Sequence, residues 1–197
     1  MSTSPRKRVL PLPRPFRQGQ LDGLCGPYAI INGLRSACSA AQIEARVSWP
    51  MLFRVLLEQL DARWRLADVV TEGIGTQEFR LCLSTAATYL KKRHGIHVTV
   101  SWPWKRRKSL QPAEAFTQLG KRLGEGCVLL LGYDGHHLAH WTVVVEANAK
   151  TLEVMDSSRR STLEVSDFVF HLEGLLTGKQ TYVLTQVSVA LVSVRKA

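Results

Sequence analysis

The sequence predicts an α+β fold, with helices in its first half and an antiparallel sheet in its second half. Up to residue 93, apolar residues recur every three or four positions in successive segments, which is the period of an amphipathic helix. From residue 96 onward, short apolar or alternating runs are separated by turn-forming residues, as in strands joined by hairpins. Helices grouped ahead of strands are typical of the α+β class, whereas α/β folds alternate the two.

The expected helices are delimited by glycine and proline. Residues between Tyr28 and Cys38 are small or apolar on almost every face, so we expect this helix to lie inside the molecule. Pro50 suits the first turn of the next helix, and Gly73 and Gly75 mark its end. The expected helices are Cys25–Cys38, a short piece beginning at Ser39, Trp49–Val70, Thr76–Arg93 and, after the first strand, Ala113–Leu123.

The strand half begins where the apolar period changes. The run from Cys127 to Tyr133 is short and continuously apolar, which predicts a buried strand. The segment around Asn148 places turn-forming residues between two apolar runs and predicts a hairpin. The expected strands are Ile96–Trp102, Cys127–Tyr133, His140–Glu146, Thr151–Met155 and Thr181–Val194, the last of which bends into two.

Length and composition agree with one globular domain. The chain has 197 residues, of which 45% are hydrophobic, enough for an ordinary core. No apolar run reaches the ~18 residues of a membrane span, so we expect none. The four cysteines form no CxxC pair and fit no zinc pattern, which predicts a reduced, cytoplasmic protein with no metal site.

The formal charge of +10 is concentrated in two stretches. Residues 1–17 hold five basic residues and residues 91–108 hold seven, and neither stretch contains an acid. The first stretch is rich in proline and lacks the continuous apolar segment of a secretory signal. We therefore expect an extended basic lead at 1–17 and a single domain at 18–197.

The second basic stretch contains the loop Lys105–Lys108, with Trp102 and Trp104 beside it. Basic residues interleaved with aromatics are typical of a surface that binds single-stranded nucleic acid or an acidic protein. Such a loop can also attract an acidic protein substrate by electrostatic steering. A solvated charged loop with no partner is the simpler interpretation, and we favour it over nucleic-acid binding.

Cys25 stands at the beginning of the first expected helix, behind the turn formers Asp22 and Gly23. The positive end of the helix dipole favours the thiolate form of a cysteine there, and hence nucleophilic attack. The competing interpretation is structural, because free cysteine is among the most buried residue types. Residues more than a hundred positions downstream favour the nucleophile.

Those residues are His140 and Asp156. His140 opens one expected strand, and Asp156 follows the next, so a hairpin between the two strands brings the imidazole beside the carboxylate. The carboxylate then fixes the imidazole tautomer and stabilises its charged form. His136 and His137 are the alternative bases, but they lie in a glycine-containing loop. A cysteine with this pair is the arrangement used in acyl transfer.

On these residues the chain resembles the papain-like cysteine peptidases. The stretch from Gln18 to Leu34 resembles the family's Gln…Cys-Gly segment, and HWTVVVEANAKTLEVMDSS, from His140 to Ser158, is similar to the His-strand-turn-strand-Asp unit of bacteriocin-leader-processing peptidases. The same unit resembles that of ubiquitin-like-protein proteases, which run in the permuted order His, Asp, Cys. The resemblance covers about residues 18–34 and 140–158 only.

The resemblance implies a papain-like fold, in which the nucleophile's buried helix packs on the C-terminal antiparallel sheet. It also implies roles for particular residues. Cys25 is the nucleophile, His140 the general base and acid, and Asp156 the orienting carboxylate. An upstream glutamine side chain and the Cys25 backbone N–H form the oxyanion hole. The family's glutamine falls about six residues before its cysteine, whereas here Gln20 is five before and Gln18 seven. We favour Gln20 and hold Gln18 in reserve. Trp141 resembles the aromatic residue that follows the family's histidine, or is a packed strand residue.

The expected function is therefore a cysteine-dependent hydrolase that cleaves a peptide or isopeptide bond through a thioester acyl-enzyme, with no metal or organic cofactor. Its partner is a protein or peptide substrate, with an acidic one among the options. A related acyl transferase, deamidase or amidase would use the same triad. A different class is a non-catalytic basic adaptor that binds nucleic acid or an acidic protein through Lys105–Lys108.

Overall fold

The computed structural model describes residues 12–43, 46–135, 139–170 and 182–196. Its helices are α1 (Cys25–Ala40), α2 (Trp49–Asp61), α3 (Leu66–Glu72), α4 (Thr76–His94) and α5 (Pro112–Gly120), with a 3₁₀ turn, η1, at Val165–Asp167. Its strands are β1 (Ile96–Ser101), β2 (Cys127–Gly135), β3 (Ala139–Ala147), β4 (Thr151–Met155), β5 (Thr162–Glu164), β6 (Phe168–Phe170), β7 (Tyr182–Leu184) and β8 (Val189–Lys196). Among the described residues, the helices α1 to α4 come before the first strand; this order of helices ahead of the sheet is the predicted one, and the fold belongs to the α+β class.

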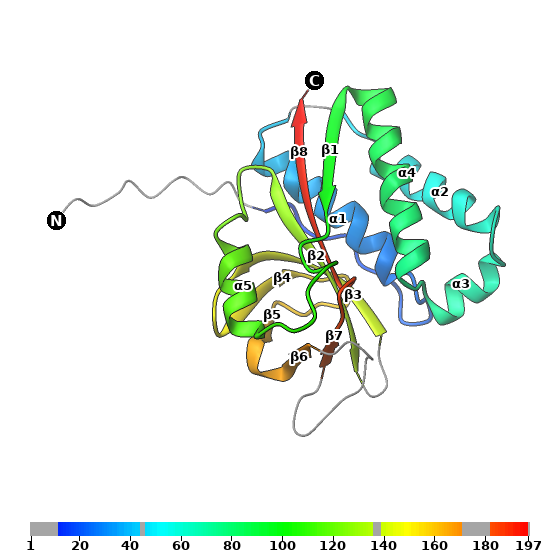
Figure 1. Cartoon of the computed structure of the whole chain (residues 1–197). Helices are drawn as coiled ribbons and strands as arrows, with labels where there is room; N and C mark the ends of the chain where they lie inside the picture. Colours follow the sequence, from blue (N-terminus) through cyan, green and yellow to red (C-terminus); the bar gives the residue numbers. More distant parts are fainter. Residues whose placement is uncertain (1–11, 44–45, 136–138, 171–181, 197) are drawn as a thin grey trace.

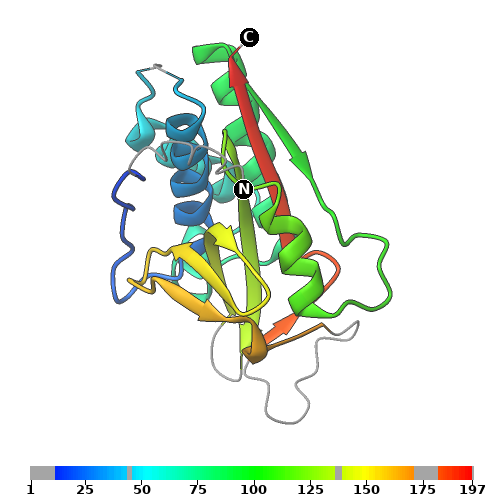
Figure 2. The same cartoon turned by 90° about the vertical axis from the view of Figure 1, so that its left-hand side faces the viewer.

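The strands form one sheet in the order β1-β8-β2-β3-β4-β5. Each neighbouring pair in that order is antiparallel. The short strand β7 pairs with the last residues of β2 and runs parallel to β6. Figures 1 and 2 show α1 along one side of this sheet and α5 on the other, with α2, α3 and α4 on the same side as α1.

Both sides of the sheet are covered, which explains the continuous apolar run in β2. Val128 and Leu130 pack in one core cluster with residues of α1, α2 and α4. Leu129 and Leu131 pack in a second cluster with residues of α5 and of the strands β4 to β8. Successive side chains of a strand point to opposite faces, so a strand between two apolar layers needs hydrophobic residues at every position.

The helix α1 is buried along most of its length, with Ile30, Leu34 and Ala37 fully inaccessible. Its buried polar residue Asn32 holds the chain segment that precedes the helix. The Asn32 Oδ1 accepts a hydrogen bond from the Phe16 N–H at 2.8 Å, and its Nδ2 donates one to the Phe16 carbonyl at 2.9 Å. Arg35 lies 4.6 Å from the Phe16 ring centroid. The described part of the basic lead is therefore extended along α1.

The expected helix Trp49–Val70 is wrong as a single element, because the chain forms α2 and α3 with a break at residues 62–65. Arg65 takes an extended backbone with ψ 119°, which ends one helix and redirects the next. A continuous helix would keep Ala67 on the buried stripe that contains Leu60. Ala67 is exposed, and Val69 is the residue of α3 that is buried.

Other expected elements differ at their ends. The helical piece expected from Ser39 is wrong over the described residues, because α1 continues to Ala40 and is followed by a turn in which Gln42 has φ 54°. The last helix ends at Gly120 rather than at Leu123. The strands β5 and β6 were not expected; each has three residues, too few to establish an alternating pattern.

The longest described helix, α4, has 19 residues and lies within one residue of its expected range. It ends at Gly95, whose left-handed backbone (φ 62°, ψ 26°) lets its N–H bond back to the helix. Basic residues fill the last turn, where they complement the helix dipole. Neither α4 nor another helix in the described ranges has the apolar length that a membrane crossing requires.

We expect Gly23→Ala to destabilise the fold, because a methyl group there would come within 2.6 Å of the Gly73 amide nitrogen. The Gly23 N–H donates to the Val70 carbonyl at 2.6 Å, so the two backbones cannot separate without breaking this bond. The cost should be about 1–3 kcal/mol, as for overpacking elsewhere. Gly75→Ala is the control, because its methyl would meet only the flexible end of Glu78. Urea unfolding of both variants tests this, and equal stability would contradict it.

Candidate active site

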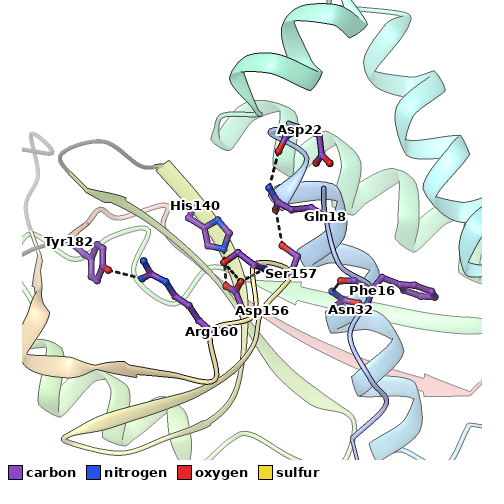
Figure 3. Close-up of polar contacts among 10 residues, drawn as sticks. Phe16, Gln18, Asp22, Asn32, His140, Asp156, Ser157, Arg160 and Tyr182 are labelled. Atoms are coloured by element: carbon purple, nitrogen blue, oxygen red, sulfur yellow. Dashed lines mark hydrogen bonds and ion pairs between the residues drawn. The ribbon is translucent and has the colours of Figure 1, made fainter. Parts of the chain in front are cut away.

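The hairpin of β3 and β4 places His140 beside Asp156. The two strands are antiparallel with Val143 opposite Met155, so the beginning of β3 and the end of β4 lie at the same end of the hairpin. His140 Nε2 and Asp156 Oδ2 are 2.8 Å apart, as Figure 3 shows. Their side chains are only 4% and 0% exposed. The predicted contact between these residues is present, and water is kept away from it.

Hydrogen bonds keep Asp156 ionised. Burial alone would raise the pKa of its carboxyl, but the hydrogen bond and charge of His140 and the hydrogen bond from Ser158 lower it to about 2. Both the backbone N–H and the hydroxyl of Ser158 donate to Asp156 Oδ1. A carboxylate that accepts several bonds loses them on protonation. Asp156 therefore remains an anion throughout the neutral range.

The pKa of the His140 imidazole is shifted in the opposite direction to that of Asp156. Burial lowers its pKa, but the hydrogen bond with Asp156, the charge of Asp156 and the nearby Cys25 thiol outweigh burial and raise the pKa to about 9. Since Asp156 occupies Nε2, Nδ1 is the ring nitrogen available to Cys25. The structure thus brings together the three residues that the sequence singled out, one from α1 and two from the hairpin.

Cys25 begins α1 and is 6% exposed. The first hydrogen bond of this helix runs from the Tyr28 N–H to the Leu24 carbonyl at 3.1 Å. The N–H groups of Cys25 and Gly26 therefore precede the helical ladder, and Pro27 has none to offer. Such unused N–H groups at a helix start favour a negative charge on the thiol and on an oxygen bound beside it.

The loop before Cys25 is ordered by Asp22. Its Oδ2 accepts a hydrogen bond from the Gly19 N–H at 2.6 Å, and its Oδ1 accepts one from the Leu24 N–H at 3.1 Å. Its carbonyl accepts a hydrogen bond from Gln18 Nε2 at 2.9 Å. Side-chain to backbone bonds of this kind replace the missing regular structure. Asp22 therefore sets the path of the chain from Gln18 to the helix.

The two glutamines of this loop have different environments. Gln18 is half-buried, and its Oε1 accepts a hydrogen bond from the Ser157 hydroxyl at 2.8 Å, next to Asp156 in the chain. Gln20 is exposed. Figure 3 shows Gln18 between Asp22 and Ser157, on the same side of the hairpin as α1. The side chain that joins the loop to the hairpin is thus Gln18, not the favoured Gln20.

The remaining histidines do not join this group where they are described. His94 packs on Tyr89 at the end of α4, and His97 lies in β1 opposite Arg195. His136 and His137, the alternative bases, lie outside the described residues. Within the described ranges, no cluster of three or more histidine, cysteine, aspartate or glutamate side chains could hold a metal ion.

The tryptophans are packing residues. Trp141 is 7% exposed, stacks on Phe79 with ring centroids 3.6 Å apart, and donates its indole N–H to the Ile74 carbonyl. Trp104 is 4% exposed in the second core cluster, and Trp102 lies beneath the Arg80 guanidinium. The aromatic residues beside the basic loop therefore do not form an open stacking surface for nucleic-acid bases.

Ser157, Ser158 and Tyr133 lie next to the pair but were not among the predicted site residues. The order Asp-Ser-Ser carried a signal for the first two, because serine donors after an aspartate are typical of a turn that ligates its own carboxylate. Tyr133 lies opposite His140 in the register of β2 and β3, with ring centroids 5.7 Å apart. Only the register reveals this neighbour, since it depends on which strands pair.

Comparison with solved structures found similarity at a low level. No protein-family model matches the chain, and no curated protein matches its sequence. The peptidase domain of Streptococcus ComA, described as a bi-functional ABC transporter involved in a quorum-sensing pathway, is 12% identical. The match covers 93% of this chain and 98% of that domain, with a TM-score of 0.47. At this level the contacts described above, and not the comparison, define the site.

We expect His140 to stay protonated up to a pH of about 9. Between the ordinary imidazole value of ~6.5 and that pH, the folded chain holds a proton that the unfolded chain has released. The free energy of unfolding should therefore fall as the pH rises through this window. Asp156→Asn should move the titration back toward the ordinary value, whereas Glu153→Gln, on the same strand but exposed, should not. Histidine NMR titrations with urea unfolding measure both, and a His140 titration unchanged by Asp156→Asn would refute the assignment.

Proposed function

We propose that this chain is a papain-like cysteine hydrolase that cleaves a peptide or isopeptide bond. One observation supports it most: a buried His140–Asp156 pair whose imidazole lies near enough to the thiol at the start of a buried helix for that thiol to raise its pKa. A structural cysteine needs neither a charged imidazole nor a helix start. A buried ionic pair costs desolvation free energy, so a pair beside a thiol suggests a chemical use.

The proposed reaction follows from the positions of the protons. In the proposed resting state Cys25 and His140 form a thiolate–imidazolium pair, in which the proton of the thiol is already on the imidazole. The thiolate sulfur attacks the substrate carbonyl carbon, and its oxygen becomes an anion. His140 then protonates the leaving amine as the C–N bond breaks, which leaves a thioester on Cys25. A water molecule loses a proton to His140 and hydrolyses the thioester, which restores the thiolate–imidazolium pair.

Asp156 supports this reaction in two ways. Its bond to Nε2 orients the ring so that Nδ1 faces Cys25, and its charge stabilises the imidazolium. The raised pKa of His140 keeps the proton on the ring at neutral pH, where it is needed for the leaving amine. The buried side chains of both residues keep this interaction strong, because charges interact more strongly where water is excluded.

For the oxyanion hole we propose Gln18 together with the Cys25 backbone N–H. Gln18 Nε2 donates one of its two N–H groups to the Asp22 carbonyl, and the second remains available as a donor. Its Oε1 is held by Ser157, so the amide cannot flip without losing both bonds. Gln20 is exposed and next to a glycine that is itself exposed, a setting that gives its side chain no fixed direction.

The other classes receive different support. Acyl transfer, deamidation and amidase chemistry use the same thiolate and acid, so they differ from hydrolysis only in the acceptor or the leaving group. The non-catalytic adaptor depended on accessible aromatics among basic residues. With Trp104 buried and Trp102 covered by Arg80, no contact of the described residues favours it.

Cys25 should be alkylated by iodoacetamide much faster than the other thiols at neutral pH. Burial raises the pKa of Cys38 to about 11 and that of Cys82 to about 12, and it also raises that of Cys127. Thiols in this state have almost no thiolate. Peptide mass spectrometry over time gives the four rates. His140→Ala should slow Cys25 at least about tenfold, and equal, slow labelling of all four thiols would rule out the nucleophile.

Gln18→Ala should slow acylation by p-nitrophenyl acetate without slowing alkylation. Acylation passes through an oxyanion, and losing one donor costs about 10²–10³-fold; alkylation has no oxyanion. The burst of p-nitrophenolate measures acylation, and the iodoacetamide rate reports an intact thiolate in the same variant. Gln20→Ala is the matched control and should leave both rates unchanged. If Gln20→Ala instead slows the burst without slowing alkylation, and Gln18→Ala does not, the oxyanion donor is Gln20.

A further inference from the structure

A line of contacts leads from the catalytic histidine to an exposed arginine. The Tyr133 ring lies near both the His140 ring and the Tyr182 ring, with centroid distances of 5.7 and 4.7 Å. The Tyr182 hydroxyl accepts a hydrogen bond from Arg160 Nη1 at 2.6 Å. In the view of Figure 3, Arg160 and Tyr182 lie on one side of the His140–Asp156 pair and Gln18 lies on the other.

Arg160 is exposed, yet its guanidinium is held in place. It follows Asp156 by four residues in the loop after β4, and its guanidinium carbon lies 5.7 Å from the Tyr182 ring centroid. No carboxylate of the described residues forms an ion pair with it. One guanidinium N–H is used by Tyr182, and four of the five are unused by the hydrogen bonds found among those residues. A fixed arginine with free donors at the rim of a reaction centre is suited to bind an anion.

A second unused donor lies beside it. Tyr133 is 2% exposed, and its hydroxyl has no hydrogen-bond partner among the described residues. Burial raises the pKa of this hydroxyl, and the Arg160 charge opposes the effect, while Asp156 and Cys25 add to it. The hydroxyl is therefore within electrostatic range of both Arg160 and the candidate triad. Buried donors normally have an acceptor, so an acceptor is expected between these groups and the thiol.

We propose that Arg160 binds a carboxylate of the substrate close to the bond that Cys25 cleaves. The proposal rests on the hydrolase function above and adds a substrate class to it, namely peptides with a carboxylate next to the scissile bond. Arg160 can donate two parallel N–H hydrogen bonds to a carboxylate, a geometry that lysine could not supply. Tyr182 is a positioning residue, because it reaches the substrate only through the guanidinium that it holds.

The test uses two thiol reagents of nearly the same size, iodoacetate and iodoacetamide, on the full chain. Iodoacetate carries a carboxylate, and the rate ratio of the two reagents at Cys25 reports anion binding beside the thiol. Arg160→Gln should lower the ratio about tenfold, the factor that corresponds to about 1.4 kcal/mol. The iodoacetamide rate should stay within about twofold, because the thiolate is formed by His140 and not by Arg160.

Arg159→Gln is the matched control, since it removes the same charge from the neighbouring position, which is also exposed. Its ratio should remain at the wild-type value, which separates a binding site from a general effect of net charge. Tyr182→Phe keeps the arginine charge but removes the bond that holds it, and it should lower the ratio by a smaller factor. A ratio that is unchanged in Arg160→Gln, or lowered equally in Arg159→Gln, would overturn the proposal.

Two sources of the carboxylate are distinguished with chloroacetyl dipeptides that react at the same thiol. Chloroacetyl-Gly-Glu-amide has a side-chain carboxylate only, chloroacetyl-Gly-Gln with a free terminus has a terminal one only, and chloroacetyl-Gly-Gln-amide has neither. The source is identified by the acidic probe that reacts faster than the neutral probe with the wild-type chain but no faster with Arg160→Gln. Equal rates for all three in the wild-type chain would count against a carboxylate site.

The outcome also separates this proposal from the proposed function. If Cys25 reacts no faster than Cys38, Cys82 and Cys127 with both reagents, the hydrolase itself is refuted. If Cys25 reacts fast with both reagents and Arg160→Gln leaves their ratio unchanged, the hydrolase stands and the carboxylate site falls. Circular dichroism of each variant confirms that the comparison is made on folded protein.

Discussion

The hydrogen bond between His140 and Asp156 is the interaction on which the candidate site depends. At 2.8 Å, between side chains that are almost wholly inaccessible, it joins the beginning of β3 to the end of β4. A buried charge without a partner is strongly unfavourable, so the two residues require each other. The sheet provides their burial, since the pairing of β3 with β4 extends to Val143 and Met155, close to the two residues.

Around this pair, the site is assembled from three separate stretches of chain. The helix α1 brings Cys25, the hairpin brings His140 and Asp156, and the loop ordered by Asp22 brings Gln18. The hydrogen bond between Ser157 and Gln18 links the loop to the hairpin. A displacement of one stretch would therefore also displace residues of the others. For this reason packing contacts such as those of Gly23 affect the geometry of the candidate site.

Much of this arrangement could be predicted from the sequence, and the reasons are local. The pairing of His140 with Asp156 follows from a short hairpin, which needs no knowledge of the remaining fold. The helix containing Cys25 follows from an apolar pattern. The division of Trp49–Val70 into two helices could not be predicted, because the same spacing of apolar residues continues across the break.

Other features depend on contacts between distant segments. Gln18 and Gln20 are indistinguishable by spacing, and the difference between them arises from Ser157, which is 139 residues from Gln18. Arg160 carries no sequence signal, because its position relative to Tyr182 depends on the pairing of β7 with β2. In both cases a polar contact between segments that are distant in the sequence determines the role of the residue. The spacing of apolar residues gives no sign of such a contact.

The bonds between Phe16 and Asn32 have one more consequence, which concerns conformational entropy. With Phe16 fastened to α1 and Cys25 inside the same helix, the segment that carries Gln18 is a short loop with both ends fixed. Ordering such a loop costs free energy when the chain folds. In the proposed reaction, substrate binding need not order this loop again, so more of the binding free energy would remain for the transition state. An N-terminal segment that contains no reacting group can in this way contribute to the rate.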